Sequence, residues 1–313
     1  MLGRTMFLYN AAVISGHSQL GGSIMENKIT GHTQLYCLLG TPVEHSGSPA
    51  MYNYSFARTG VDAVYLAFDV PLEHLAEGIA AVKALHVRGF NVTMPDKTAV
   101  MEYLDEITPA AKLIGACNTV TVADDEKLIG YNTDCVGFTN NLQANGVEMN
   151  GKKIVLLGAG GAATAICVQA ALDGAAEVAI FNRRDEFYDN GLQTVQKLAA
   201  AVPTCRVSMN DVNDRTVLQQ AIKECDILVN ATKVGMKPLD GISLIDPCWL
   251  RSELVVADTV YSPLETRLIQ DAKTAGCKAI GGIGMLLWQG VAAFKLFTGK
   301  EMPREEVQER FFS

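Results

Sequence analysis

Two charged side chains, Lys97 and Asp134, stand where they could take part in proton transfer. Lys97 follows a Met94-Pro95 turn, and Asp134 opens a segment of helical character. An ammonium group beside a carboxylate in a closing cleft could protonate a developing alkoxide, with each charge holding the ionisation state of the other. The alternative is a solvated lysine and an aspartate that caps a helix, and the two residues alone favour that second interpretation.

A hydroxyl-rich loop, HSGSP at residues 45–49, could bind an anion. Ser46 and Ser48 flank a glycine just before a predicted helix, so hydroxyls and backbone N–H groups could hold a carboxylate there. By itself, the loop is better explained as an ordinary helix cap. Asn118 and Gln289 could hydrogen-bond sugar-like hydroxyls, or they could satisfy buried backbone groups.

The stretch KIVLLGAGGAATAICVQA at residues 153–170 predicts a dinucleotide site. An apolar run that stops at Gly158 is typical of a buried parallel strand, and a small-residue helix should follow. Gly158 permits the tight turn, Gly160 lets the backbone approach a pyrophosphate at the helix N-terminus, and Ala163 replaces the third glycine of the pattern. The alternative is a bare structural turn between a strand and a helix.

A second apolar strand, Glu177–Phe181, strengthens the dinucleotide interpretation. It ends at Asn182-Arg183-Arg184-Asp185, about 24 positions after the first glycine, where the ribose of a dinucleotide is bound. We therefore predict a nicotinamide dinucleotide as the cofactor.

Composition excludes several function classes. The chain has 313 residues, 49% hydrophobic and 19% charged, enough for one large core and room for a second. A net charge of -8 and the lack of a basic cluster argue against nucleic-acid binding. Eight scattered cysteines without a C-x-x-C pair indicate reduced thiols in the cytoplasm and no metal site. The apolar stretch Met285–Phe294 is too short to span a membrane.

The first 30 residues are expected to form a poorly ordered leader, with a start codon chosen upstream of Met25. Met6–Ser15 behind Arg4 faintly resembles a signal peptide. Export is disfavoured, because reduced thiols and a diffusible cofactor belong inside the cell.

From Gln34 onward the pattern alternates between strands and helices. The expected strands are 35–39, 64–68, 89–92, 118–122, 128–131, 154–157, 177–181, 205–208, 227–230, 254–258 and 277–279. The expected helices are 51–58, 72–85, a segment carrying Val100 and Leu104, 109–114, 134–145, 263–275, 285–297 and 304–312.

Alternation of this kind predicts an α/β fold of two domains, with parallel-rich sheets and binding at the strand C-termini. We expect a substrate domain from residues 31–133 plus 286–313 and a Rossmann-like NAD(P)-binding domain from residues 134–285. The reaction should take place in the cleft between them.

Six motifs taken together resemble one known family. In chain order, HSGSP, NVTMPDK, GACNT, YNTD, GAGGAA and GMLLWQG resemble the shikimate dehydrogenase family. The similarity runs from about Leu35 to near the C-terminus. FNRRDEF and TKVGMKPL are particularly similar to its quinate/shikimate dehydrogenase branch.

This resemblance implies NAD(P)-dependent interconversion of 3-dehydroshikimate and shikimate, or of 3-dehydroquinate and quinate, in chorismate and aromatic amino acid biosynthesis or in quinate use. Lys97 would be the general acid/base, and Asp134 would be its partner that also holds a substrate hydroxyl. The implied substrate ligands are Ser46, Ser48 and Tyr261 for the carboxylate and Thr93, Asn118 and Gln289 for ring hydroxyls.

On the cofactor side the resemblance implies a larger set. It comprises Gly158, Ala159, Gly160, Gly161, Ala162, Asn182, Arg183, Arg184, Asp185, Lys233, Thr259, Val260, Tyr261, Ser262 and Gly282. Asp185 can bond ribose hydroxyls and would repel a 2′-phosphate, so we expect NAD to be used at least as well as NADP.

Other functions stay open at this point. The chain could be a dehydrogenase of another substrate class, such as folates or amino acids, or a metabolite-binding regulator without turnover. Between quinate and shikimate, the NVT sequence before Met94-Pro95 and the two serines favour shikimate. We expect a small-molecule substrate as partner and a monomer or homodimer.

Overall fold

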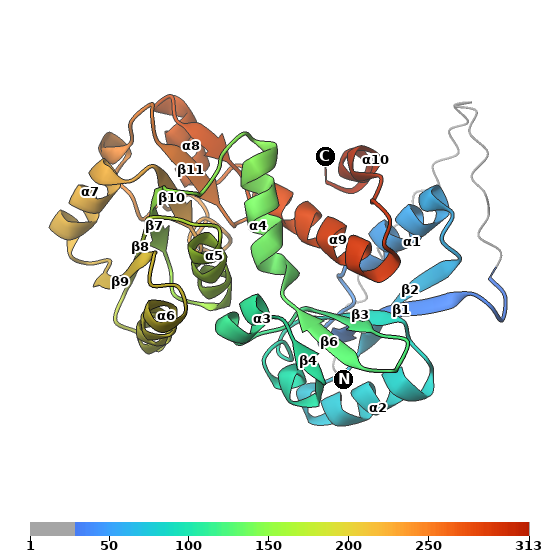
Figure 1. Ribbon diagram of the computed structural model, residues 1–313. Helices are drawn as coiled ribbons and strands as arrows, with labels where there is room; N and C mark the ends of the chain where they lie inside the picture. Colours follow the sequence, from blue (N-terminus) through green and yellow to red (C-terminus); the bar gives the residue numbers. More distant parts are fainter. Residues whose placement is uncertain (1–28, 313) are drawn as a thin grey trace, which may run out of the picture.

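A computed structural model of the protein describes residues 29–312. The predicted leader, residues 1–30, lies outside the described residues except for its last two. The described chain forms two lobes, each built on a six-stranded sheet (Figure 1). This arrangement confirms the predicted α/β fold class.

The first sheet is mixed. Its strand order is β2-β1-β3-β5-β6-β4, with β1, β2 and β3 parallel and β5 and β6 forming an antiparallel hairpin. The strands are β1 (Gln34–Gly40), β2 (Ala63–Asp69), β3 (Gly89–Val92), β4 (Glu106–Ile107), β5 (Thr119–Val122) and β6 (Leu128–Tyr131). The two strands of this hairpin correspond to the strands expected at residues 118–122 and 128–131.

Alternating side chains of β1 supply two apolar cores, one on each face of this sheet. Tyr36 and Leu38 pack with α1 (Ser48–Thr59), α9 (Ile283–Thr298) and α10 (Arg304–Phe311). Cys37 and Leu39 point to the other face, where α2 (Leu75–Ala84) and α3 (Pro109–Ile114) lie. Because both faces are covered, β1 is apolar along most of its length.

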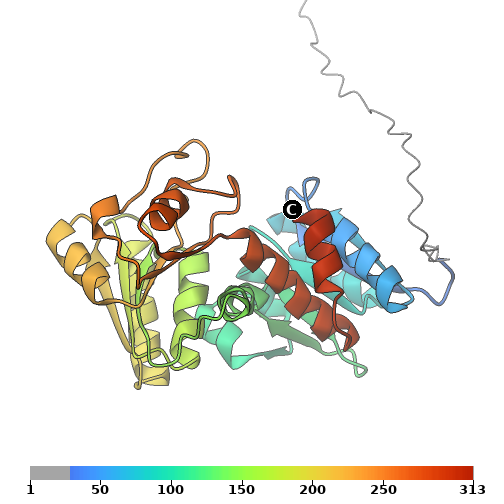
Figure 2. The ribbon, with the colours of Figure 1, turned by 90° about the horizontal axis from the view of Figure 1, so that it is seen from above.

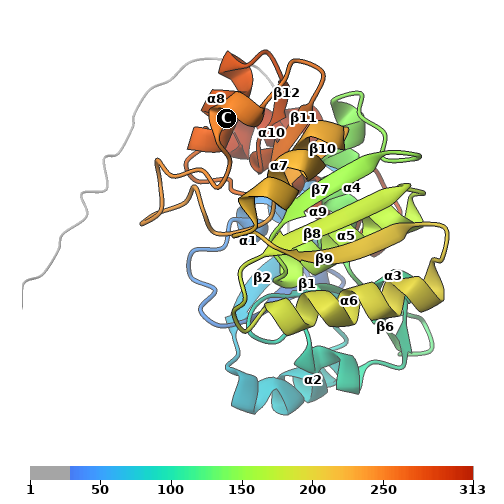
Figure 3. The same cartoon turned by 90° about the vertical axis from the view of Figure 1, so that its left-hand side faces the viewer.

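The second sheet is fully parallel, in the order β12-β11-β10-β7-β8-β9 that Figure 3 shows. Its strands are β7 (Lys153–Leu157), β8 (Glu177–Asn182), β9 (Arg206–Asp211), β10 (Ile227–Asn230), β11 (Val255–Asp258) and β12 (Lys278–Ile280). Helices α4, α5 and α6 cover one face, and α7 and α8 cover the other. Their bounds are α4 (Thr133–Ala144), α5 (Gly161–Leu172), α6 (Tyr188–Ala201), α7 (Arg215–Glu224) and α8 (Arg267–Thr274).

Helices α4 and α9 join the lobes and pack against each other, as the view from above shows (Figure 2). Gly137 of α4 makes this close approach possible. A Cβ atom added there would lie 2.7 Å from the backbone nitrogen of Gln289 and 2.8 Å from the carbonyl oxygen of Met285. The apolar side of α9 also packs against β1 and α1 of the first lobe.

Several predicted boundaries were wrong. The helix expected from Pro263 begins at Arg267, because the Thr266 hydroxyl accepts a hydrogen bond from Ile269 N (3.3 Å) and caps it. The helix expected over residues 72–85 is a short 3-10 helix, Leu72–His74, followed by α2. The segment carrying Val100 and Leu104 is also 3-10 helical over Ala99–Tyr103, and the strand expected to end at Ser208 continues to Asp211.

Candidate active site

A cavity of about 520 Å³ lies at the carboxyl ends of β1 and β3, where the lobes meet. This is the edge at which open α/β sheets bind their ligands. Its lining includes all eight residues predicted for catalysis and substrate binding, namely Ser46, Ser48, Thr93, Lys97, Asn118, Asp134, Tyr261 and Gln289.

Lys97 and Asp134 form an ion pair in this cavity. Lys97 Nζ lies 2.7 Å from Asp134 Oδ2, and the two side chains are 29% and 25% exposed. Asn118 Nδ2 donates to the other oxygen, Asp134 Oδ1, at 2.9 Å. The N-cap of α4 is Asn132, whose side chain accepts from Cys135 N. The alternative of a solvated lysine and a capping aspartate is therefore wrong.

A buried chain of polar side chains fixes the Asn118 amide behind this pair. Asn118 Oδ1 accepts from Thr133 N at 2.7 Å, and the hydroxyls of Thr133 and Thr119 lie 3.0 Å apart. Asn91 Nδ2 donates to Thr119 Oγ1 at 2.9 Å, and Tyr65 OH donates to Asn91 Oδ1 at 2.8 Å. None of these four supporting residues was predicted as functional, although Asn91, Thr119 and Thr133 lie within the motifs NVTMPDK, GACNT and YNTD.

The serine loop is only in part an ordinary helix cap. The N-cap residue of α1 is Gly47, which has no side chain, while Ser46 Oγ accepts from Ser48 N at 3.3 Å. Both serines and the start of α1 border the cavity. Hydroxyls and helix amides therefore meet at one wall, which suits a carboxylate.

Two further predicted ligands reach the cavity from the second half of the chain. Gln289 comes from α9 and donates from Nε2 to Leu286 O at 3.1 Å. Tyr261 is 49% exposed on the loop after β11. Since this loop belongs to the second lobe, the cavity is completed by both halves of the molecule.

The glycine turn between β7 and α5 has the shape that a pyrophosphate requires. Gly158 has φ +111°, and a Cβ there would lie 2.8 Å from Ala231 O, so only glycine fits. A Cβ at Gly160 or Gly161 would meet nothing within 4 Å, which leaves open space in front of the α5 N-terminus. No side chain caps α5, so its first amides can bind an anion. These residues fit a dinucleotide.

The remaining residues of that turn have different surroundings. Ala159 is buried, and its carbonyl oxygen accepts from Asn190 Nδ2 at 2.6 Å. Ala162 is exposed, whereas Ala163 is 1% exposed in the core, as the third position of the motif requires. Asn190 was not predicted and is another contact that holds the turn.

The turn after β8 is organised by Asp185. Its carboxylate accepts from Arg183 Nε (2.7 Å), Asn182 Nδ2 (2.8 Å) and Phe187 N (3.0 Å). The bond from Arg183 is the main reason that the pKa of Asp185 lies below its usual value. Arg184 instead pairs with Asp211 at 3.1 Å. Carboxylate and guanidinium groups thus stand side by side where a ribose would be bound.

The other predicted cofactor residues lie on loops after β10 and β11 and at the start of α9. Lys233 and Ser262 are exposed, and Val260 is 5% exposed. A Cβ at Gly282 would lie 2.5 Å from the Thr259 carbonyl oxygen. Gly282 therefore allows the Thr259 loop to lie directly on the α9 N-terminus.

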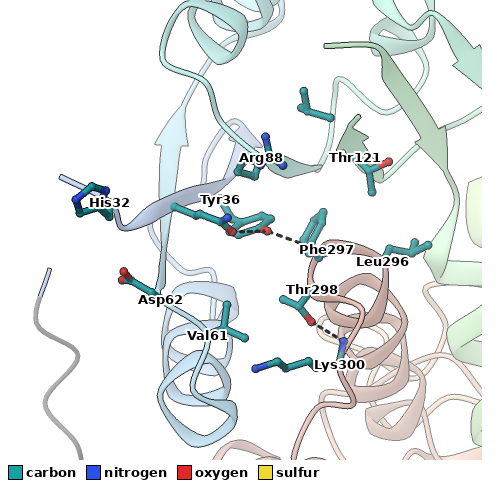
Figure 4. A pocket seen from close by; sticks show the side chains of 12 residues that line it. His32, Tyr36, Val61, Asp62, Arg88, Thr121, Leu296, Phe297, Thr298 and Lys300 are labelled. Carbon is teal, nitrogen blue, oxygen red and sulfur yellow. Dashed lines mark hydrogen bonds between the residues drawn. The ribbon is translucent and has the colours of Figure 1, made fainter. Parts of the chain in front are cut away.

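A second hollow, of about 440 Å³, lies on the far side of the first lobe at the amino ends of β1 and β3 (Figure 4). Three of its polar side chains are engaged by the protein. Tyr36 OH donates to Phe297 O at 2.9 Å, Lys300 Nζ to Thr59 O at 2.9 Å, and Arg88 pairs with Asp124 at 3.1 Å. This hollow has no contact with the Lys97–Asp134 pair.

The described residues contain no group of three His, Cys, Asp or Glu side chains that could hold a metal ion. Within the same residues, no helix is long and apolar enough to cross a membrane. All eight cysteines are free thiols, and burial raises the pKa of Cys37 and Cys117 to about 12.

Family models and curated relatives point to the same family. The family description "Shikimate dehydrogenase substrate binding domain" matches residues 38–120, and "Shikimate 5'-dehydrogenase C-terminal domain" matches residues 282–310. A shikimate dehydrogenase (NADP+) of Listeria monocytogenes is 48% identical over 286 residues, which cover 91% of this chain and 98% of that protein.

Solved structures of several enzymes share this fold. Shikimate 5-dehydrogenase from Listeria monocytogenes, in complex with shikimate and NAD, has a TM-score of 0.88 and 47% identity, covering 90% of this chain and 97% of its own. Quinate dehydrogenase from Corynebacterium glutamicum, in complex with NAD, has a TM-score of 0.80 at 28% identity, covering 90% of this chain and 99% of its own.

Proposed function

The chain belongs to the shikimate dehydrogenase family, and we propose that it interconverts shikimate and 3-dehydroshikimate with a nicotinamide dinucleotide. The observation that carries this assignment is the Lys97–Asp134 pair, 2.7 Å apart, in a cavity that the serine loop borders together with Tyr261 and Gln289. A proton donor, an anion-binding wall and a dinucleotide turn are the parts that such a reaction needs.

Lys97 is proposed as the general acid/base. When shikimate is oxidised, the Lys97 amine takes the proton of the reacting hydroxyl while the hydrogen on the same carbon leaves as hydride. In the opposite direction, the Lys97 ammonium returns the proton to the oxygen. The bound nicotinamide supplies the acceptor or donor of the hydride.

Asp134 is proposed to orient the Lys97 amine and to accept a hydrogen bond from a substrate hydroxyl. Its other oxygen is already held by Asn118 at 2.9 Å, so the carboxylate has a fixed direction. Groups held in position before the reaction lower its barrier, because less reorganisation is needed in the transition state.

The remaining cavity residues are proposed to bind substrate. Ser46 and Ser48, with Tyr261 closing from the second lobe, would hold the carboxylate, while Thr93, Asn118 and Gln289 would hold ring hydroxyls. We propose shikimate rather than quinate as the preferred substrate. The 48% identity to a shikimate dehydrogenase, against 28% to a quinate dehydrogenase, supports this choice.

For the cofactor, we propose that the turn at Asn182–Asp185 accepts NAD at least as well as NADP. The fixed carboxylate of Asp185 favours ribose hydroxyls, and its ion pair occupies Arg183. A comparison of kcat/KM for the two cofactors tests this proposal. A preference for NADP above about 100-fold, or close to 3 kcal/mol, would refute it.

The other predicted cofactor contacts remain proposals of the same kind. The backbone of residues 158–162 would bind the pyrophosphate, and Lys233, residues 259–262 and Gly282 would border the nicotinamide half. We likewise propose residues 31–133 with 286–313 as the substrate domain and 134–285 as the nucleotide domain.

We also propose that the enzyme works in the cytoplasm, as its free thiols favour, and acts as a monomer or homodimer. Sedimentation of the purified protein would distinguish the two states.

Absorbance at 340 nm, recorded with shikimate and with quinate, each with NAD and with NADP, tests the assignment. We expect the fastest turnover with shikimate. Folded protein that is silent in all four assays would instead favour the metabolite-binding regulator without turnover. Activity confined to quinate would contradict the substrate choice and leave the reaction class intact.

A further inference from the structure

Asp258 is a buried carboxylate at the end of β11 that no step above uses. Only 2% of the surface of Asp258 is exposed. Oδ1 accepts from Val260 N (2.9 Å) and Asn230 Nδ2 (2.9 Å), and Oδ2 accepts from Thr266 Oγ1 (2.6 Å). Two of the three donors belong to the segment that follows β11, which carries Tyr261.

Asn230 repeats this arrangement on the neighbouring strand. It ends β10, stands directly opposite Asp258 in the parallel pair, and is 3% exposed. Besides Asp258, its side chain donates to Val234 O (3.0 Å) and accepts from Thr232 Oγ1 (2.7 Å). These two bonds hold the loop that carries Lys233.

The two loops also touch the parts of the molecule that would hold ligands. Ala231 lies against the glycine turn, since a Cβ at Gly158 would come within 2.8 Å of its carbonyl oxygen. Thr259 lies on Gly282, the N-cap residue of α9, which carries Gln289. The Asn230–Asp258 hydrogen bond is therefore a direct link between a loop packed on the glycine turn and a loop that borders the substrate cavity.

The fold alone does not call for a carboxylate at this position. Burying one in an apolar sheet is costly unless it is fully hydrogen-bonded, and burial raises the pKa of Asp258 despite its three donors. The two donors outside β10, Val260 N and Thr266 Oγ1, lie in the segment that connects β11 to α8 and carries Tyr261. The Asp258 carboxylate therefore stabilises the loops and not the sheet.

We propose that Asp258 is a positioning residue, linked through Asn230, that couples the loop carrying Lys233 to the loop carrying Tyr261. Occupancy of the dinucleotide site then fixes the Tyr261 loop and raises affinity for the substrate carboxylate, and the effect is reciprocal. This inference rests on the proposed function, because it assumes that these two loops contact cofactor and substrate.

Coupling is measured as the change in the dissociation constant of shikimate when NADPH is present, by titration calorimetry. Shikimate and NADPH form a pair that cannot react, so binding is separated from turnover; NADH replaces NADPH if only NADH binds. In the wild type we expect saturating NADPH to tighten shikimate binding at least fivefold.

Two variants test the link. Asp258→Ala removes all three hydrogen bonds, and Asn230→Ala cuts the connection between the loops while leaving Val260 N and Thr266 on Asp258. In each variant, NADPH should lower the dissociation constant of shikimate by less than twofold. Thr266→Ser is the matched control, because it keeps the hydroxyl and should keep the wild-type ratio. If Asp258→Ala does not fold, the coupling measured for the Asn230→Ala protein tests the link on its own.

The outcomes distinguish a failure of the proposed function from a failure of the proposed role of Asp258. A wild type that binds NADPH but no shikimate contradicts the proposed function. A wild type that binds both without coupling, or folded variants that keep the fivefold effect, overturns the role of Asp258. A lower melting temperature with an unchanged ratio would mean that the cluster is only structural.

Discussion

Single residues around Lys97 hold the Lys97–Asp134 pair in one arrangement. Each oxygen of Asp134 has one partner, Lys97 on one side and Asn118 on the other. Asn118 is in turn held by Thr133. A carboxylate with both oxygens engaged keeps its direction, which an acid/base pair requires. Asp96, the residue beside Lys97, has no such support.

Asp96 is fully buried, and neither of its carboxyl oxygens has a hydrogen-bond partner within the described residues. Burial, followed by the nearby charge of Glu73, raises its pKa. The folded protein thus keeps this proton to a higher pH than the unfolded chain does. Stability is therefore lost as pH rises from about 4 through the raised pKa of Asp96.

Asp96→Asn should remove that loss. We expect the variant to be more stable than the wild type at pH 8, with a smaller difference near pH 4. Urea unfolding at both pH values measures this. Asp124→Asn, at a carboxylate that is 97% exposed, is the control and should change stability by less than about 0.5 kcal/mol. An equal gain for Asp96→Asn at both pH values would contradict the explanation.

Asp185 provides a second prediction at this scale. Asp185→Ser removes the carboxylate and frees Arg183, a guanidinium that can bind a 2′-phosphate. The ratio of kcat/KM for NADP to that for NAD should rise about tenfold or more. Asp211→Asn, which frees only Arg184, serves for comparison. No change in the ratio with Asp185→Ser would mean that this turn does not determine the preference between NAD and NADP.

At the scale of elements, the contact between α4 and α9 determines where Asp134 and Gln289 stand relative to each other. Gly137 lies one turn beyond Asp134, and its missing side chain leaves room for the backbone of Gln289. A backbone neighbour cannot move aside as the end of a side chain can. Gly137 therefore limits how closely the two helices can approach at this point.

Gly137→Ala should force the helices apart. Overpacking of this kind typically costs about 1–3 kcal/mol, and KM for shikimate should rise because Gln289 moves away. Chemical unfolding and steady-state kinetics measure the two effects. Gly78→Ala in α2, where the nearest atom is a Val70 methyl group at 3.1 Å, should change stability by less than about 1 kcal/mol and leave KM unchanged. Equal behaviour of the two variants would contradict this explanation.

Element types were predictable from apolar patterns, whereas several ends were not. The run before Gly158 predicted β7 because a strand buried on both faces needs continuous apolar residues. The two-residue strand β4 carries too little pattern to be recognised, and its pairing with β6 depends on contacts between distant parts of the chain. The late start of α8 follows from the Thr266 cap, which competed with the predicted start at Pro263.

At the scale of the whole molecule, the site exists only because two lobes meet. Lys97 and Asp134 are 37 positions apart, and Tyr261 and Gln289 come from still later elements. The resemblance of six motifs predicted that these residues lie in one site, whereas Lys97 and Asp134 considered alone favoured a solvated lysine and a capping aspartate. The supporting residues Asn91, Thr119, Thr133, Asn230 and Asp258 were not predicted as functional, because a polar residue at a strand end has many uses and only the fold reveals its partners.

Turnover and binding by Lys97→Ala test the central claim most directly. If Lys97 carries the proton, kcat with shikimate should fall by about 10²–10⁴, while calorimetry shows shikimate bound with a dissociation constant within about fivefold of the wild type. A Lys97→Ala protein that folds, binds shikimate and keeps more than a tenth of the wild-type kcat would contradict the assignment of Lys97 as the general acid/base.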